Sequence, residues 1–264
     1  QSGMFESVHF VPNASDCGLS AGAGLYVYYR LSEKSYHGYD GHFSPFLGSE
    51  PFDLDELPEL NKRYPSKEFS AEQTPKILAR LIGRDYIVGV IRGRYEVGPR
   101  ALGNRSILCN PFNKDMRDIL NRKIKKREWY RPFAPVAAAE ESSKYFTNTV
   151  DIPYMSVICY TRPEYRGKLP SVTHVDGSAR LQTVRRSQNP FLYDSLKAFE
   201  GISGAPVFLN TSFNPKGEPI LNYCSAGLKM LEDTDLDFVL IKDTFYVRPG
   251  REDLLKNLDK VPTT

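Results

Sequence analysis

The sequence predicts an α+β fold with a mixed sheet. Strand-length apolar runs, such as residues 86–91, are interspersed with helical patterns, and no regular β–α–β alternation recurs along the chain. With 264 residues the chain can bury a full core, and its 41% hydrophobic content is that of a globular protein. No apolar run has the length of a membrane span and no signal peptide is recognisable, so we expect a cytoplasmic protein.

Three regions of the chain differ in composition. In residues 1–32, the apolar run of residues 8–12 predicts a short strand, and a loop then enters a helix of small residues, which needs a partner surface to pack against. Residues 33–70 are rich in Gly, Pro, Ser, Tyr and acidic residues, which predicts a linker or an irregular wrapped segment. Residues 71–264 carry most of the predicted helices and strands and are expected to form the main domain.

The elements of the main domain follow from periodicity. Apolar residues at helical spacing predict helices over residues 71–81, 116–125, 190–199 and 226–231. Apolar and β-branched runs predict strands over residues 86–91, 133–139, 154–160, 171–184, 206–210 and 238–241. Asn113 precedes the second helix and is a candidate for its N-cap.

Positive charge is concentrated in one part of the chain. The net charge is +3, yet residues 92–131 hold eight Arg and four Lys against four acidic residues. Such a basic centre predicts a focused anion site. Nucleic-acid binding is the weaker interpretation, because no RNP-like motif, tandem repeat or zinc finger accompanies the charge. The four cysteines and four histidines have no metal-ligand spacing, so free thiols are expected.

Residues 93–106, GRYEVGPRALGNRS, form the most informative stretch. They follow the strand predicted over residues 86–91 and combine three arginines, three glycines, a proline and an asparagine. Glycine lets the backbone approach a ligand, and the arginine fork binds phosphate or carboxylate in a bidentate manner. The stretch therefore predicts a pocket for an anionic, phosphate-bearing substrate. A surface turn with solvated arginines is the alternative.

A second basic cluster, KKREWYRPFAP, occupies residues 125–135. Lys125 and Arg127 are two residues apart, so they share a face if the segment is extended. Arg131 precedes a proline, whose ring restricts the backbone there. Lysines and arginines at these positions are suited to neutralise phosphate oxygens.

Two polar clusters complete the set. Residues 173–182, THVDGSARLQ, contain His174 and Asp176, and residues 210–214, NTSFN, place Asn210, Ser212 and Asn214 on one face after an apolar strand. A hydrogen-bonded interior histidine and a simple turn are the structural alternatives. No nucleophile–base pair is recognisable, so the clusters predict charge stabilisation and positioning, which suits phosphoryl or nucleotidyl transfer.

The four clusters, in this order, resemble the C-terminal part of the O-carbamoyltransferases of antibiotic and nodulation-factor biosynthesis. The matching segments are GRYEVGPRALGNRS, IKKREWYRPFAP, VTHVDGSARLQTV and PVFLNTSFNPKGEPI, with SPFLGSE as a weaker one, over residues 40–250. The resemblance implies a YrdC-like fold over residues 71–264, in which a twisted mixed sheet with helices forms a concave nucleotide-binding face. It also implies that residues 1–32 are the remnant of an actin/Hsp70-like domain.

The resemblance implies a transferase as well. Members of the family use carbamoyl phosphate and ATP, with Mg²⁺, to form a carbamoyl-adenylate, and the carbamoyl group then passes to a hydroxyl of a small-molecule acceptor. The expected catalytic residues are Lys125, Arg127, Arg131 and His174, and the expected substrate- and nucleotide-binding residues are Arg94, Gly98, Arg100, Asn104, Arg105, Asp176, Arg180, Gln182, Asn210, Ser212 and Asn214. The pairs Lys125/Arg127 and Ser212/Asn214 resemble the Lys-x-Arg and Ser-x-Asn pairs of YrdC-like proteins.

The opening residues NASDCGLSAGAGLY resemble the last loop and helix of the family's actin/Hsp70-like domain, where an aspartate is a metal ligand. This implies that Asp16 binds an iron-type metal, although Cys17 stands where Ser or Asn is commoner. One carboxylate cannot hold such an ion alone, and the family's metal-binding histidines would lie in a missing N-terminal domain. We therefore expect the C-terminal piece of a longer enzyme, one that forms the adenylate without completing transfer.

Two other functions stay open at this point. An RNA-binding module is one, because YrdC-like proteins include binders of double-stranded RNA and the centre of this chain is basic. A nucleotide-sensing domain without catalysis is the other. The sequence also leaves the choice between a monomer and a homodimer open.

Overall fold

A mixed eight-stranded sheet is the central feature of the structure, a computed structural model that describes residues 4, 11–14, 16–32, 44–148 and 150–259. The strand order is β1-β10-β9-β2-β3-β8-β4-β7. The strands are β1 Ser66–Glu68, β2 Val88–Ile91, β3 Arg105–Cys109, β4 Ala134–Ala138, β7 Gln182–Val184, β8 Val207–Ser212, β9 Phe238–Ile241 and β10 Thr244–Tyr246. The pairs β2/β9 and β4/β7 are parallel and the others are antiparallel, which confirms the predicted mixed sheet.

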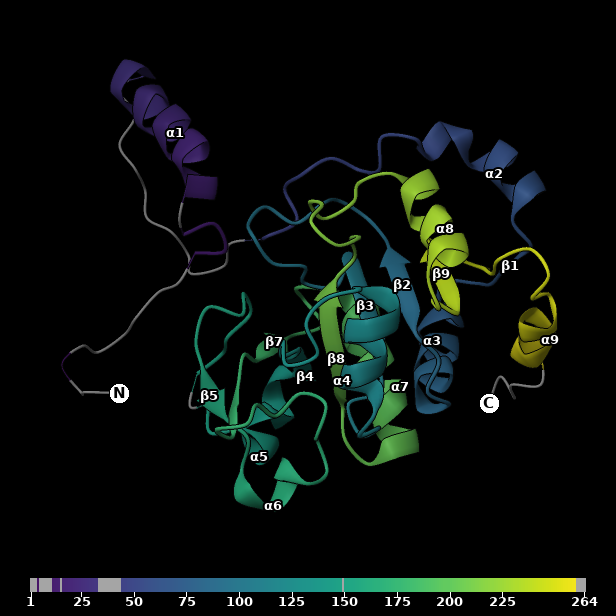
Figure 1. Ribbon diagram of the computed structural model, residues 1–264. Helices are drawn as coiled ribbons and strands as arrows, with labels where there is room; N and C mark the ends of the chain where they lie inside the picture. Colours follow the sequence, from purple (N-terminus) through teal and green to yellow (C-terminus); the bar gives the residue numbers. More distant parts are fainter. Residues whose placement is uncertain (1–3, 5–10, 15, 33–43, 149, 260–264) are drawn as a thin grey trace.

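Helices cover both faces of this sheet (Figure 1). On one face lie α3 (Thr74–Gly83), α7 (Pro190–Ser203) and α9 (Asp253–Asp259). On the other lie α8 (Cys224–Asp233), α4 (Met116–Ile119) and the π-helix η3 (Leu120–Ile124). Each face of the sheet has its own hydrophobic core, and side chains alternate between the two cores along each strand. Val88 and Val90 of β2 enter the core under α3 and α7, whereas Ile91 enters the core under α8.

Local sequence signals explain where helix α7 begins and ends. The Asn189 side chain accepts a hydrogen bond from the Leu192 backbone N–H at 3.0 Å, and Pro190 occupies the first helical position. Gly204 ends the helix with a left-handed φ of 78°. The helix therefore begins where the sequence predicts it and extends four residues further than expected, to Ser203.

Residues 139–179 form a small lobe beside the end of the sheet. It contains η4 (Ala139–Glu141), α5 (Ser142–Tyr145), α6 (Pro163–Arg166) and a two-stranded sheet of β5 (Cys159–Tyr160) and β6 (Ser178–Ala179). The predicted strands over residues 154–160 and 171–184 are mostly wrong. Between Leu169 and Ser178 the chain turns: the Thr173 N–H donates to the Leu169 carbonyl, and the His174 N–H to the Ser178 carbonyl.

Residues 44–70, for which linker and wrapped segment were both open, wrap onto the sheet. They include η2 (Leu54–Glu56) and α2 (Leu57–Arg63), and their last part supplies edge strand β1. The backbones of Gly48 and Ser49 exchange hydrogen bonds of 2.9 and 2.8 Å with that of Tyr95. Residues 44–70 are therefore a wrapped segment that packs against the main domain.

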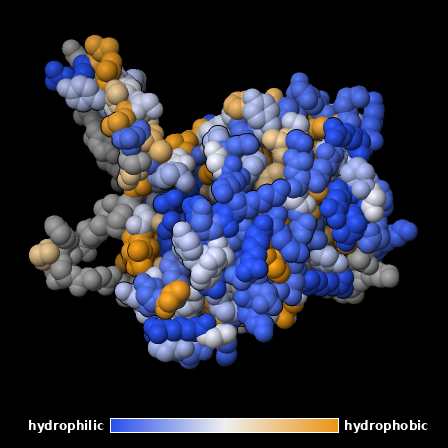
Figure 2. All heavy atoms as spheres, viewed as in Figure 1, coloured by the Kyte–Doolittle hydropathy of each residue, from blue (hydrophilic) through white to orange (hydrophobic). Residues whose placement is uncertain are grey.

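The N-terminal elements stand apart from this body. η1 (Asp16–Gly18) leads into α1 (Leu19–Ser32), which projects away from the sheet and has no buried residue (Figure 1). Apolar side chains are exposed along α1, whereas the same view of the body is mainly hydrophilic (Figure 2). The short strand expected near residues 8–12 falls mostly outside the described residues. None of the described helices is long and apolar enough to span a membrane.

Candidate functional site

A π-helical turn places Lys125 and the loop that follows it. Leu120 and Ile124 of η3 are buried in the core, and π-helices are frequent at functional sites because they redirect the chain. Lys125 has a helical φ of −87° and Lys126 a left-handed φ of 46°. The expectation that Lys125 and Arg127 share a face of an extended segment is therefore wrong.

Asn121, which the sequence analysis missed, holds this loop in place. It is fully buried, and its Nδ2 donates to the carbonyls of Trp129 at 3.0 Å and Arg131 at 2.9 Å. Its Oδ1 accepts a hydrogen bond from Arg127 Nε at 2.7 Å. The Asn121 side chain thus fixes the backbone of the loop and the guanidinium of Arg127. In the sequence, this role is indicated only by the position of an asparagine just before a basic loop.

Lys125 joins this loop to the end of strand β8. The side chain is 4% exposed, and its Nζ donates to Asn214 Oδ1 at 2.9 Å, to the Asn214 carbonyl at 3.1 Å and to the Ser212 carbonyl. Ser212 Oγ donates to Asn214 Oδ1 at 2.6 Å. The structure thus brings together Lys125, Ser212 and Asn214, as the sequence predicts.

Five cations gather around this point, and we call them the cationic cluster: Arg100, Lys125, Arg127, Arg131 and Arg180. Burial, together with the charges of Arg127 and Arg131, lowers the pKa of Lys125 to about 7. Burial and the charges of Arg131 and Arg180 lower the pKa of Arg127 to about 10. Burial and Arg100 lower the pKa of Arg180. These shifts link the five side chains in a chain of pairs: Lys125 with Arg127 and Arg131, Arg127 with Arg131 and Arg180, and Arg180 with Arg100.

The cationic cluster is poorly neutralised by the protein itself. Glu128 is an acid beside it, and its Oε2 lies 3.9 Å from Arg131 Nη1 at an exposed position. Arg180 Nε is buried and has no hydrogen-bond partner among the described residues. Because buried donors and clustered cations are costly without partners, an anionic ligand would stabilise this arrangement.

The Gly/Arg loop, residues 93–106, is organised by a buried carboxylate. Glu96 Oε1 accepts hydrogen bonds from the backbone N–H groups of Leu102 at 2.9 Å, Asn104 at 2.8 Å and Arg105 at 3.1 Å. Burial raises the pKa of Glu96 despite these bonds. The sequence analysis did not predict this role of Glu96. Its signal in the sequence is a single acidic residue within an arginine-rich stretch.

Arg105, expected to bind substrate, lies inside the Gly/Arg loop. Arg105 is 0% exposed, and its guanidinium donates to the carbonyls of Arg92, Gly93 and Asn104 and to Asn222 Oδ1. All these distances lie between 2.8 and 3.1 Å. The protein uses every donor of this guanidinium, so in this structure Arg105 holds the Gly/Arg loop together, and a contact with substrate stays a prediction.

Three polar residues of the predicted set fasten the Gly/Arg loop to its surroundings. Asn210 Nδ2 donates to the Ala101 carbonyl at 3.2 Å and to Gln182 Oε1 at 2.8 Å. Gln182 Nε2 donates to the Leu102 carbonyl at 2.9 Å. Asn104 Nδ2 donates to the Arg94 carbonyl at 2.8 Å. These bonds position the backbone beside Arg100, and Asn210 Oδ1 is buried without a hydrogen-bond partner among the described residues.

Arg94 and Gly98 contact other segments of the chain. Arg94 donates to the carbonyls of Leu47 and Gly48 at 2.7 Å each. Gly98 has a φ of 129°, and a Cβ there would lie 2.4 Å from the Pro12 carbonyl oxygen. Glycine is therefore required at this position by backbone packing against the N-terminal segment, without reference to any ligand.

His174 and Asp176 lie in the turn of the small lobe rather than on a strand. His174 Nδ1 is 2.9 Å from Ser178 Oγ, and Asp176 Oδ1 accepts a hydrogen bond from the Ser178 N–H at 2.9 Å. Burial lowers the pKa of His174, which favours the neutral imidazole. Both side chains line a hollow of about 370 Å³ with Arg117 and Tyr130, and Arg180 is within electrostatic range of His174.

The described residues do not provide a metal site around Asp16. Asp16 is exposed in η1, and no group of three or more His, Cys, Asp or Glu side chains is found within the described ranges. Cys17 is exposed and Cys109, Cys159 and Cys224 are buried, and all four are free thiols, as expected.

Comparison with known proteins identifies the family. Residues 79–248 match the family model described as carbamoyltransferase C-terminus. The chain belongs to this family. It is 37% identical over 255 residues to nodulation protein NolO of Bradyrhizobium diazoefficiens, covering 94% of this chain and 45% of that protein. It is 38% identical over 250 residues to the 3'-hydroxymethylcephem-O-carbamoyltransferase of Amycolatopsis lactamdurans, with the same coverage.

The match to the carbamoyltransferase family confirms the resemblance drawn from the four clusters. The chain spans about half the length of the curated relatives it matches. A solved structure of full-length HypF in the phosphate- and nucleotide-bound form aligns with a TM-score of 0.43 and 19% identity, over 70% of this chain and 22% of that one.

Proposed function

We propose that this chain is the part of an O-carbamoyltransferase that binds ATP and carbamoyl phosphate and forms a carbamoyl-adenylate on a YrdC-like fold. The observation that carries the proposal is the cationic cluster, which the protein neutralises little and in which Lys125 contacts Ser212 and Asn214. Family membership and the O-carbamoyltransferase relative support the choice of carbamoyl chemistry.

The reaction explains why so many cations are needed. Water displaces the phosphate of carbamoyl phosphate and leaves carbamate, and a carbamate oxygen then attacks the α-phosphorus of ATP. The α–β bond of ATP breaks, so the products are carbamoyl-adenylate, phosphate and pyrophosphate. Both substrates and both leaving groups are polyanions, and Mg²⁺ accompanies ATP as part of the substrate. Fixed positive charge around them lowers the barrier because it requires no reorganisation during the reaction.

The residues divide into two roles in this proposal. The five cations of the cationic cluster supply positive charge to the phosphate oxygens. Ser212 and Asn214 supply neutral polar groups that orient the phosphates. Asn121, Glu96, Gln182 and Asn210 position the two loops that carry the cations. His174 lies at the border of the site, next to Arg180.

Transfer to a hydroxyl acceptor is assigned to the rest of a longer enzyme. In this proposal residues 1–32 are the end of an actin/Hsp70-like domain, and α1, which has no buried residue, packs within that domain. The metal of that domain would need ligands besides Asp16, because one exposed carboxylate does not suffice. We therefore derive no step through a metal for this chain.

Pyrophosphate release tests the proposal. The 264-residue chain, given Mg²⁺, ATP and carbamoyl phosphate, is expected to release pyrophosphate, and omission of carbamoyl phosphate should abolish the release. Lys125→Ala should remove most of the activity, whereas Lys123→Ala, an exposed lysine paired with Asp235 at 3.2 Å, should retain it. ATP binding without pyrophosphate release would indicate a nucleotide sensor. Tight binding of double-stranded RNA that weakens steeply with salt, without catalysis, would indicate an RNA-binding module.

A further inference from the structure

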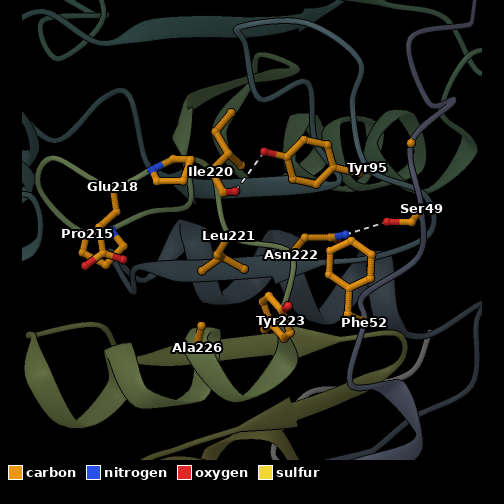
Figure 3. Close-up of a pocket in the computed structure, with 12 residues that line it drawn as sticks. Ser49, Phe52, Tyr95, Pro215, Glu218, Ile220, Leu221, Asn222, Tyr223 and Ala226 are labelled. Carbon is orange, nitrogen blue, oxygen red and sulfur yellow. Dashed lines mark hydrogen bonds between the residues drawn. The ribbon is translucent and has the colours of Figure 1, made fainter.

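A second hollow, of about 600 Å³, is lined by the loop that follows β8 (Figure 3). Its walls come from three separate segments: Phe52 from the wrapped segment, Tyr95 from the Gly/Arg loop, and residues 215–226, which include Pro215, Leu221, Tyr223 and Ala226. We call it the aromatic pocket. Its volume is in the range of small-molecule sites, and no residue predicted from the sequence lines it.

The walls of the aromatic pocket are held in place by hydrogen bonds. Tyr95 donates from its hydroxyl to the Ile220 carbonyl at 2.8 Å, and Asn222 Nδ2 donates to Ser49 Oγ at 2.8 Å (Figure 3). Behind them, Asn222 Oδ1 accepts from the buried Arg105 guanidinium. The pocket is therefore preformed, and a ligand would not have to order it.

The chemistry of the walls suits an uncharged ring. Phe52 is 63% and Tyr223 50% exposed, which is unusual for large apolar side chains, and their rings meet at 5.3 Å with an interplanar angle of 54°. Apart from the two tyrosines, Glu218 is the single ionisable residue that lines the pocket among the residues the structure describes. With a carboxylate and no cation, the pocket cannot favour a phosphate, whereas a planar ring can stack on the exposed aromatic faces.

The aromatic pocket and the cationic cluster share one loop. Asn214 accepts from Lys125 on the side of the cluster and donates from Nδ2 to the Glu218 carbonyl at 2.6 Å, next to the pocket. The Leu221 N–H donates to the Phe213 carbonyl at 3.0 Å, which brings the pocket wall back beside the end of β8. A site for anions and a site for an uncharged ring thus adjoin each other across a few residues.

A nucleotide has this same division, with charged phosphates at one end and an uncharged planar base at the other. Resting on the proposed function, we propose that the aromatic pocket binds the base of the nucleotide whose phosphates the cationic cluster binds. Tyr223 and Phe52 supply the stacking surface, and Ala226 of α8 lies at the floor of the pocket. Inorganic tripolyphosphate, which has no base, would then contact the cluster alone.

The test compares ATP with inorganic tripolyphosphate as probes, both with Mg²⁺, by calorimetric titration of the 264-residue chain. Tyr223→Ala and Phe52→Ala should each raise the Kd for ATP about 5- to 100-fold, the range of one lost base–aromatic stacking contact. The Kd for tripolyphosphate should stay within twofold of the parent value. Tyr160→Ala is the matched control, since Tyr160 is 50% exposed and lies on β5 in the small lobe.

A variant that fills the pocket gives an independent test. Ala226 is exposed on α8, so Ala226→Phe adds bulk at the pocket without disturbing the core. It should weaken ATP binding and leave tripolyphosphate binding and thermal stability close to those of the parent. Because Ala226→Phe removes no aromatic ring, it tests the pocket even if Tyr223→Ala or Phe52→Ala perturbs the loop that follows β8.

The outcomes separate this inference from the proposed function. If the parent binds ATP and all three pocket variants bind it equally well, the base lies elsewhere and the proposed function stands. If the variants lose ATP and tripolyphosphate to the same extent, they act through the shared loop, and the pocket assignment is overturned. If the parent binds neither probe, the proposed function fails and this inference with it.

Discussion

Two arginine-rich loops of this protein use their charges in opposite ways. In the Gly/Arg loop, Arg105 is fully buried and donates to three backbone carbonyls and to Asn222. In the loop of residues 125–131, Asn121 satisfies the backbone carbonyls, and the Arg131 side chain stays 53% exposed with one ion-pair contact, 3.9 Å from Glu128. An arginine is thus available to a ligand where the protein leaves its donors unpaired, and the density of arginines in a sequence does not by itself distinguish the two cases.

The largest effect expected from this comparison is on folding. Arg105→Ala would leave three carbonyls and Asn222 without their donor and would open a cavity in the core, so we expect a loss of about 3–5 kcal/mol in the free energy of unfolding. Urea denaturation measures this loss, with Arg94→Ala, whose side chain is exposed, as the control. A stable Arg105→Ala variant that binds ATP poorly would instead show that Arg105 contacts the ligand.

The other loop should behave in the reverse way. The Arg131 side chain is 53% exposed, and its ion pair with Glu128, at 3.9 Å, is weak. Arg131→Ala should therefore lower carbamoyl-phosphate-dependent pyrophosphate release about 100- to 1000-fold and change the unfolding free energy by less than about 0.5 kcal/mol. Unfolding of Arg131→Ala would show a structural role and contradict the site.

Arg100→Lys should also lower pyrophosphate release, because an ammonium does not reproduce the bidentate fork of a guanidinium.

The sequence predicts the sheet better than it predicts the site. Strands β2 and β9 are apolar runs buried on both faces, and β8 begins with the buried apolar run Val207–Leu209, so composition alone predicts them. Strand β3 begins with Arg105 and Ser106, and its polar start was assigned to binding because the hydrogen bonds that bury it come from residues far along the chain, such as Asn222. The local sequence pattern around Arg105 gives no indication of a partner as distant along the chain as Asn222.

The aromatic pocket and the small lobe show the same limit. The pocket joins residues 48–52, Tyr95 and residues 215–226, and no spacing within one segment indicates that they meet. In the lobe, residues 171–177 have the alternation of a strand, yet Gly177 takes a left-handed φ of 81° and the chain turns back on itself. In both cases long-range contacts and turn geometry override the local apolar pattern.

Asn121 offers a way to sharpen the comparison by removing the support of the second loop. Asn121→Leu keeps the side-chain size but breaks three hydrogen bonds, so the Kd for inorganic tripolyphosphate should rise about tenfold and stability should fall by about 1–3 kcal/mol. Asn61→Leu, which removes a 2.6 Å bond from Tyr246 far from the site, should cost stability without changing the Kd. Equal Kd values for Asn121→Leu and the parent would mean that Asn121 supports the fold alone.

The smallest effect concerns the charge state of Lys125 itself. Burial and its two arginine neighbours lower the pKa of Lys125 from its ordinary value of 10.5 to about 7. The ammonium therefore loses its proton as pH rises through 7, and tripolyphosphate affinity should fall about tenfold between pH 6 and pH 8. Lys125→Arg keeps its charge throughout this range, so its pH dependence reports the titration of the probe alone and serves as the reference.

Folding stability supplies the opposite sign from the same lysine. Between pH 7 and 10.5 the unfolded chain binds a proton at Lys125 that the folded chain does not, so stability should rise with pH in this window relative to a Lys125→Met variant. Phosphate affinity and stability should thus move in opposite directions as pH increases. If tripolyphosphate affinity has the same pH profile in the parent and in Lys125→Arg, Lys125 stays charged in the cationic cluster. Another cation of the cluster would then be the one that loses its proton.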